Sequence, residues 1–263
     1  MNSLNIFFDE ETKRIDSLYH FTKFKNFKSI ISNCCLYMTQ INDNLNDKKE
    51  KEYVKGIEEY YITCFTSEMN ELFWNHKDYG ENEKYAVCIK LNSKRLSELV
   101  FRYENGEEIS NGPREFGYLY KNNYSDFRLH GVSIHKVIYK ENPMDDLIID
   151  EELYNNYKGC ANLDREEIKK KCTRIKNRGY VKSVIDCNGN DQSYENEHRV
   201  ITILTYKGAR MIEPLPYHKI TKILLDFSNI KNDVVAYVKK GFECKEEFVE
   251  ICQKYGIKYE IVE

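Results

Sequence analysis

Short apolar runs bounded by polar residues recur along the chain, and this pattern predicts β-strands. The first four runs are LYHFT (18–22), CLYMTQ (35–40), YYITCFTS (60–67) and KYAVCIKL (84–91). The later runs are GVSIHKVIY (131–139), HRVITILTY (198–206), ITKILLDFS (220–228) and IKYEIV (257–262). GVSIHKVIY alternates apolar with polar residues, as half-buried strands do, whereas HRVITILTY is apolar at consecutive positions. The second pattern predicts a central strand that is covered on both faces.

Apolar residues with helical spacing occur in fewer places. FKNFKSIIS (24–32) and CKEEFVEICQKYG (244–256) carry apolar residues three and four positions apart, and Gly256 ends the second segment. NELFWNHK (70–77) has a shorter pattern of the same kind. The highly charged segment 144–178 also reads as helical, and we expect it to form an insertion packed on one side of the domain.

These elements indicate the fold class. About seven or eight strands are predicted with few helices between them. Because the strands do not alternate regularly with long helices, a doubly wound parallel sheet is disfavoured. We expect an α+β fold in a single domain over residues 1–263.

Composition limits the partners and the cellular location expected for the protein. The chain has 263 residues, 41% of them hydrophobic, and 40 basic against 43 acidic residues give a net charge of −3. A charge so near zero provides no overall attraction for nucleic acid, although a local basic patch is compatible with it. The apolar runs all fall short of the roughly 20 residues of a membrane span, and the N-terminus lacks the pattern of a signal peptide. We expect a cytoplasmic protein without a membrane partner.

Several chemical classes have no matching motif. The nine cysteines include no Cys-x-x-Cys pair, so we expect neither a zinc site nor another metal. The P-loop, the Gly-x-Gly-x-x-Gly loop, the Gly-x-Ser-x-Gly elbow and the His-Glu-x-x-His motif are all missing from the sequence. These absences disfavour the corresponding nucleotide-binding, hydrolase and metalloprotease classes.

Charged residues precede the predicted central strand, in the segment SYENEHRV (193–200). If the segment is extended, Glu195, Glu197 and Arg199 share one face, because side chains alternate along a strand. One interpretation is a solvated strand entrance with an ion pair worth about 0–1 kcal/mol. The other is that the carboxylates face a ligand, since a charge at the end of a central strand is costly to bury without partners or a task.

Other polar and aromatic residues admit a structural and a functional interpretation. On a strand, His20 and Thr22 share a face, and His20 alone is most simply a core histidine bonded to a backbone carbonyl. Asn46 and Asp47 could cap a helix. Trp74, the only tryptophan, is more often a core residue than a platform for a ligand.

The order of these features resembles the bacterial domain-of-unknown-function family numbered 2971. The matching motifs are YHFT, LYMT followed by Asn-Asp, CFT, a single Trp on a helix, YAVCIKL and YENEHR, which together cover residues 18–228. Three positions depart from the family pattern. Lys48 follows Asn-Asp where proline is usual, Lys77 occupies the tyrosine position of Trp-x-x-Tyr, and His198 replaces tryptophan in the last motif.

That family is similar in turn to the ADP-ribosyltransferase fold, with a split or mixed sheet and peripheral helices. Members of the fold carry His or Arg on a first strand, Ser, Thr or Tyr on the next, and Glu late in the sheet. The resemblance places His20, Thr39 (or Tyr37) and Glu197 at these positions and implies that they converge on one site. It implies that Glu197 stabilises the cation formed when NAD loses nicotinamide, and that Glu195 faces the acceptor.

The resemblance implies NAD as co-substrate and a macromolecular acceptor, either protein or nucleic acid. It also implies a toxin or anti-phage effector with an antitoxin or defence-system partner. The residues expected to contact NAD are His20, Thr22, Tyr37, Thr39, Asn46, Asp47, Trp74 and Arg199, with Trp74 largely buried as support. Two alternatives stay open: a catalytically inactive nucleotide- or partner-binding module on the same fold, and an NAD glycohydrolase without an acceptor.

Overall fold

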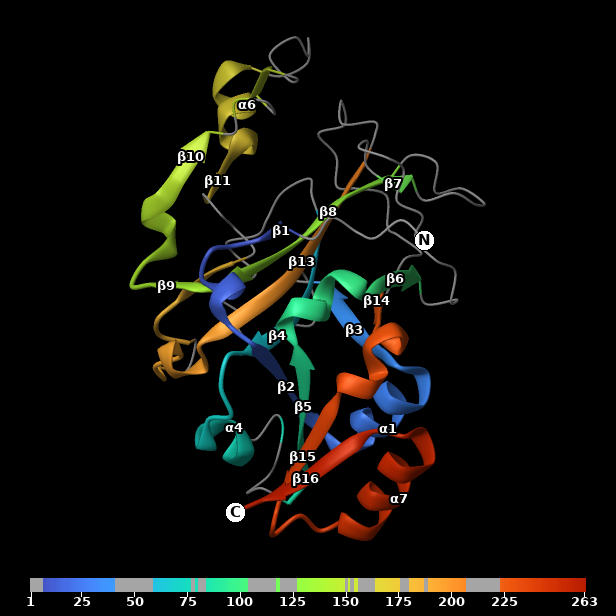
Figure 1. Cartoon of the computed structure of the whole chain (residues 1–263). Coiled ribbons are helices and arrows are strands. Elements are labelled where there is room, and N and C mark those ends of the chain that lie inside the picture. Colours follow the sequence, from blue (N-terminus) through green and yellow to red (C-terminus); the bar gives the residue numbers. More distant parts are fainter. Residues whose placement is uncertain are drawn as a thin grey trace.

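We describe the fold from a computed structural model of the chain (Figure 1). It describes residues 7–40, 59–76, 79, 84–103, 117–118, 127–149, 151, 154–155, 164–175, 180–186, 189–206 and 223–263. The fold is α+β, with few helices around a sheet of 12 strands that is largely antiparallel. The helices whose bounds lie in the described residues are α1 (Phe24–Asn33), α4 (Glu71–Asn75), α6 (Arg165–Cys172) and α7 (Lys245–Tyr255).

The main path of the sheet joins strands from both ends of the chain. In spatial order it consists of β1 (Phe7–Phe8), β8 (Phe127–Lys136), β13 (Glu197–Tyr206), β4 (Glu59–Thr66), β2 (Ser17–Lys23), β5 (Ala86–Asn92), β15 (Val235–Lys239) and β16 (Lys258–Val262). The pairs β1–β8 and β15–β16 are parallel, and the other neighbours on this path are antiparallel. The predicted strand at 198–206 is central, as its apolar run indicated.

The sheet divides at β4. One edge of β4 pairs with β13 from Glu59 to Thr66. On the other edge, Thr66 pairs with Tyr19 of β2, whereas Tyr61 and Ile62 pair with β3 (Cys35–Gln40). From β3 the second branch continues to β14 (Ile223–Asp226) and β6 (Val100–Tyr103). Strands β2 and β3 therefore diverge from a common neighbour, as Figure 1 shows.

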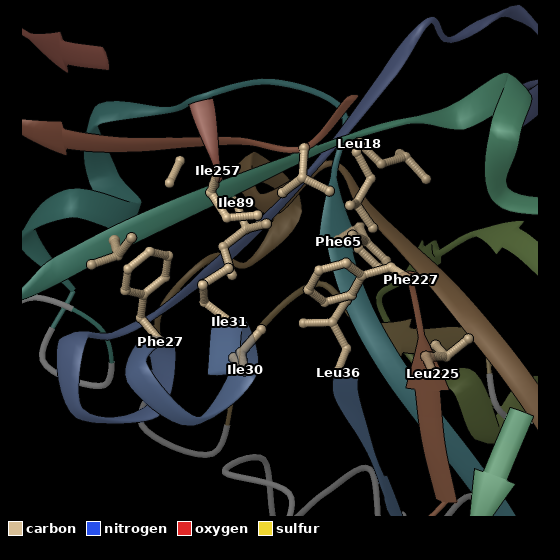
Figure 2. Packing of buried hydrophobic residues seen from close by; sticks show 14 of the residues in the cluster. Leu18, Phe27, Ile30, Ile31, Leu36, Phe65, Ile89, Leu225, Phe227 and Ile257 are labelled. Carbon is tan, nitrogen blue, oxygen red and sulfur yellow. The ribbon is translucent and has the colours of Figure 1, made fainter. Parts of the chain in front are cut away.

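One face of the sheet packs against α1 and α7. Helix α1 directs Phe27 and Ile31, both fully buried, toward the sheet, as the predicted helix at 24–32 required. Phe27 also contacts Phe248 of α7, with ring centroids 5.3 Å apart. Figure 2 shows how these side chains and those of β2, β4 and β5 form one continuous core.

The opposite face carries a smaller aromatic cluster under α4. Asn70 caps this short helix by accepting a hydrogen bond from the Leu72 N–H. Phe73 stacks on Phe21 of β2, and Trp74 meets the same ring edge-on at 5.0 Å. Alternate residues of β2 thus serve different cores on the two sides of the sheet.

The charged insertion at 144–178 is helical only in part, which corrects the prediction. Its described part begins with a 3₁₀ turn (Pro143–Asp146) and β10 (Leu147–Ile149), and ends with α6 and β11 (Thr173–Ile175). Strands β10 and β11 pair antiparallel and lie with α6 at one end of the molecule (Figure 1). The cause is local: Leu147, Ile148 and Ile149 form an apolar run with two β-branched residues inside a charged segment.

Smaller elements complete the described part. Strand β7 (Gly117–Tyr118) pairs with β8, and β9 (Ile138–Lys140) pairs in parallel with β12 (Val181–Ser183). The remaining 3₁₀ turns are η1 (Thr12–Arg14), η2 (Ser93–Glu98), η4 (Ser193–Glu195) and η5 (Ser228–Asp233). Among the residues that the structure describes, no helix combines the length and apolar character needed to cross a bilayer.

Candidate functional site

Four ionisable side chains form one buried network at the start of β13. The Lys182 ammonium lies 2.6 Å from Glu195 Oε2 and 3.4 Å from Glu197 Oε2. Arg199 holds Glu197 with two nitrogens, Nε at 2.7 Å from Oε1 and Nη2 at 3.2 Å from Oε2. The side chains of Lys182, Glu197 and Arg199 are 9%, 7% and 1% exposed, and that of Glu195 is 19% exposed.

The two glutamates reach this network from different backbone conformations. Glu195 ends the 3₁₀ turn η4, whereas Glu197 is the first residue of β13. Asn196, between them, adopts a left-handed conformation with φ of 41°, which asparagine tolerates better than most residues. The expectation that the two glutamates share a face of one strand is therefore wrong, and it is the turn at Asn196 that brings both to Lys182.

Glu197 and Arg199 form a buried ion pair rather than a solvated strand entrance. Burial by itself raises the pKa of Glu197, but Arg199 and Lys182 outweigh it and hold this pKa at about 2. The Cys64 thiol on the neighbouring strand also hydrogen-bonds the carboxylate. Glu197 is consequently ionised throughout the physiological pH range.

The same surroundings shift the pKa of Glu195 in the opposite direction to that of Glu197. Burial raises the pKa of Glu195, and the attraction of Lys182 only partly offsets this, while the charge of Glu197 adds to the increase. Two neighbouring carboxyl groups whose pKa values are moved apart are typical of sites that separate an electrostatic task from proton transfer. Here Glu197 suits the first task and Glu195 the second.

Three tyrosines interact with the Glu195 carboxylate. Tyr139 Oη lies 3.5 Å from Glu195 Oε2, and Tyr79 and Tyr194 interact electrostatically with the same carboxylate. Burial raises the pKa of Tyr79 and Tyr139, and repulsion from Glu195 and Glu197 adds to the increase. Their phenols stay protonated at neutral pH and can donate hydrogen bonds.

Lys182, Tyr139 and Tyr194 were not among the residues predicted from the sequence. Their signal is weak: Lys182 and Tyr194 lie on elements that periodicity did not identify, and Tyr139 is only the last residue of the strand predicted at 131–139. A lysine between the apolar or small residues of YVKSVI is the one feature that could have indicated a buried cation. Tyrosines are so numerous in this chain, at 21, that their positions carried no information.

His20 lies beside this network but on the other face of the sheet. Tyr19, Thr66 and Glu197 pair in one row across β2, β4 and β13, so their side chains share a face and His20 projects from the opposite one. The His20 ring packs edge-on against Phe65, and its Nδ1 lies 2.9 Å from the Cys64 carbonyl oxygen. The structure thus places His20 and Glu197 on opposite faces of the sheet, one residue of strand register apart.

Thr22 and the β3 residues are also displaced from the network. Thr22 is buried on the same face as His20, two positions further along β2. Thr39 pairs with Ile62, whose partner on β13 lies four residues beyond Glu197, a distance of about 13 Å along the strand. Tyr37 is exposed, and its hydroxyl lies 3.3 Å from Ser29 Oγ. The structure therefore places Tyr37 and Thr39 at the fork of the sheet, away from the two glutamates.

Trp74 is a core residue, as its structural interpretation predicted. It is 1% exposed and packs against Phe21, with the Lys239 ammonium 5.9 Å from its ring centroid. This burial agrees with the expectation that Trp74 is largely buried, and it leaves the indole without an open face for a ligand. Asn46 and Asp47 lie outside the described residues.

Comparisons with known proteins add no further constraint. Within the described ranges, no group of three or more His, Cys, Asp or Glu side chains could hold a metal ion. No protein-family model, curated protein or solved structure matches the chain. The interpretation of the site consequently depends on its own geometry and on the motif resemblance.

Proposed function

We propose that the protein is an NAD-dependent mono-ADP-ribosyltransferase of the ADP-ribosyltransferase-like fold, and that its catalytic residues are Glu197 and Glu195. One observation carries the proposal. The buried, ionised carboxylate of Glu197 and the half-buried carboxyl of Glu195, whose pKa is raised, both contact Lys182 at the start of a central strand. The motif resemblance supplies the substrate, NAD.

The reaction assigns a separate task to each carboxylate. The bond between ribose C1′ and the nicotinamide nitrogen breaks, and nicotinamide leaves as a neutral molecule with the bonding electron pair. The ribose becomes an oxocarbenium-like cation, which the fixed charge of Glu197 stabilises without accepting a proton. A lone pair of the acceptor then forms the new bond to C1′, and ionised Glu195 takes the acceptor's proton.

The residues present fit the part of NAD that reacts. The nicotinamide ring of NAD carries a positive charge, which favours aromatic faces and carboxylates. Tyr79, Tyr139 and Tyr194 provide the aromatic groups beside the two glutamates. Arg199 is bound bidentately to Glu197 and is therefore proposed to orient that carboxylate rather than to bind a phosphate.

His20 takes a different part in this proposal from the one that the resemblance implies. It hydrogen-bonds the Cys64 carbonyl where β2 leaves β4, and the Cys64 thiol hydrogen-bonds Glu197. His20 is thus proposed to position the strand beside Glu197 and not to contact NAD. A cytoplasmic toxin or anti-phage effector with an antitoxin or defence-system partner is the proposed setting.

A catalytically inactive binding module is the second candidate. The observation that favours it is the complete pairing of Glu197 with Arg199 and Lys182, because such a network also satisfies buried charges without any reaction. In that case the ion pairs at the start of β13 would only stabilise the fold, and the protein would leave NAD uncleaved.

The test is to incubate the purified protein with NAD and to quantify nicotinamide and protein- or nucleic-acid-linked ADP-ribose. Transfer predicts both products, a glycohydrolase predicts nicotinamide and free ADP-ribose, and an inactive module predicts neither. Glu195→Gln is the matched control, because it should reduce transfer to an acceptor more than nicotinamide release. Equal loss of both products would contradict the division of tasks between the two glutamates.

A further inference from the structure

Lys182 enters the candidate site from a strand outside the main path of the sheet. It is the middle residue of β12, which pairs in parallel with β9 so that Lys182 is opposite Tyr139. Val181 and Ser183 on either side are buried, and the lysine side chain is itself only 9% exposed. A lysine is rarely buried to this extent unless its charge is paired.

We propose that Lys182 is a positioning residue of this site: its ammonium group bridges Glu195 and Glu197 and determines which of the two carboxylates accepts the proton. The inference rests on the proposed function, because it names the group that keeps Glu195 able to act as a base. Lys182 itself is proposed to transfer no proton and to touch no reacting atom.

The distances distinguish the contacts of Lys182 from those of Arg199. Arg199 contacts Glu197 with both Nε and Nη2. Lys182 is 2.6 Å from Glu195 but 3.4 Å from Glu197, so its stronger interaction is with Glu195. Each carboxylate therefore has its own principal cation, and that of Glu195 is a lysine.

Glu195 depends on this lysine more than Glu197 does. The titratable groups that face Glu195 are Tyr79, Tyr139, Tyr194, Glu197, Arg199 and Lys182. The tyrosines are neutral and Glu197 is repulsive, while Arg199 is engaged by Glu197 and has the smaller effect on Glu195. Without Lys182, burial and repulsion would leave the Glu195 carboxyl protonated to higher pH.

The test compares Lys182→Met with Lys182→Arg in the full-length chain. Lys182→Met should reduce ADP-ribosyl transfer at neutral pH by about 100-fold, the loss typical of a base that is protonated. The acid limb of the transfer pH profile should move to higher pH, and nicotinamide release should change by less than about tenfold because Glu197 keeps Arg199. Lys182→Arg should return the acid limb toward the wild-type position.

A matched control is Lys169→Met on α6, where the lysine is partly exposed and paired with Glu166 at 2.9 Å. It should leave both products and the pH profile unchanged. If Lys182→Met loses transfer and release equally, with an unshifted profile, Lys182 is only a structural ion-pair partner and the inference is overturned.

A titration of the wild-type protein tests the inference without an activity assay and without variants that must fold. In ¹³C-detected spectra, the Lys182 side-chain resonances should shift with the same midpoint as the Glu195 carboxyl resonance. Separate midpoints would contradict the bridge. If the protein releases no nicotinamide from NAD, the proposed function is refuted. The shared titration midpoint of Lys182 and Glu195 can still be measured in that case.

Discussion

His20 and Glu197 project from opposite faces of the sheet, although only β4 separates their strands. The row Tyr19–Thr66–Glu197 fixes this relationship, since His20 follows Tyr19 by one residue. The His20 ring is linked to the neighbourhood of Glu197 by its hydrogen bond to the backbone carbonyl of Cys64 on β4. The bond satisfies an acceptor at the point where β2 diverges from β4.

This arrangement has an energetic basis. A buried carbonyl without a donor costs about 1–3 kcal/mol, and a sheet that divides loses ladder partners along the diverging edges. Burial lowers the pKa of His20, so the ring is neutral at physiological pH and one nitrogen carries the proton that it can donate. A neutral donor at the fork thus satisfies the Cys64 carbonyl where β2 leaves β4.

Trp74→Ala should lower the free energy of unfolding by about 3–5 kcal/mol, the usual cost of removing a large aromatic side chain from a core. Trp74 is 1% exposed and packs edge-on against Phe21. Urea unfolding followed by far-UV circular dichroism measures the change. Leu72→Ala on the same helix is the control, because Leu72 is 52% exposed and should cost no more than about 0.5 kcal/mol.

Asn196→Ala should destabilise the protein by about 1–2 kcal/mol, whereas Asn196→Gly should be nearly neutral at this backbone conformation. The reason is the positive φ of 41°, which glycine adopts without a steric cost. Both variants lose the hydrogen bond from Asn196 Nδ2 to Glu68 Oε1, so their difference isolates the backbone effect. Equal thermal midpoints for the two variants would show that the turn between Glu195 and Glu197 is not strained.

Protein stability should fall as the pH decreases from about 6.5 to about 4, in part because of His198. Burial lowers the pKa of His198 from 6.5 to about 4, and its Nδ1 lies 2.9 Å from Thr12 Oγ1. In this window the unfolded chain binds a proton that the folded chain excludes, so unfolding becomes easier by about 3 kcal/mol in total.

Comparing wild type with His198→Gln isolates that contribution, since His20 and His135 also have lowered pKa values and change stability in the same direction. Urea unfolding at a series of pH values should give a shallower dependence for the variant. Identical slopes for the two proteins would show that His198 is not the group responsible.

The sequence predicted those elements whose apolar pattern is strong and local. The helices at 24–32 and 244–256 and the strand at 35–40 agree with α1, α7 and β3, since each buries one regular face. Strand β15 was not predicted, because VAYVK is short and mostly buried on both faces and therefore lacks alternation. Strand order could not be read from periodicity, since β4 selects partners from distant parts of the chain.

The candidate site was predictable only in part for the same reason. Glu195, Glu197 and Arg199 were identified because charge next to an apolar strand is unusual. Lys182 comes from another strand, and only the pairing of β12 with β9 places it on the two glutamates. Motif resemblance carries residue identity but not register, so it could not indicate that His20 and Glu197 project from opposite faces.

In the proposed function, the charge of Glu197 takes part in breaking the bond to nicotinamide. Glu197→Gln preserves the side-chain volume but leaves Arg199 without its anionic partner, so we expect a loss of stability of about 3–5 kcal/mol. The assay must therefore be run below the unfolding transition of the variant, with circular dichroism confirming the folded state. Glu195→Gln, measured alongside, controls for the removal of a neighbouring carboxylate.

The most direct measurement is the rate of nicotinamide release from NAD by folded Glu197→Gln. The predicted result is a loss of about 10²–10³-fold in kcat, because a fixed charge that stabilises the transition state is removed. Affinity for NAD should be retained, since the loss concerns the transition state rather than the ground state. Wild-type kcat in a folded Glu197→Gln protein would contradict the catalytic assignment and leave the buried network as a structural ion pair.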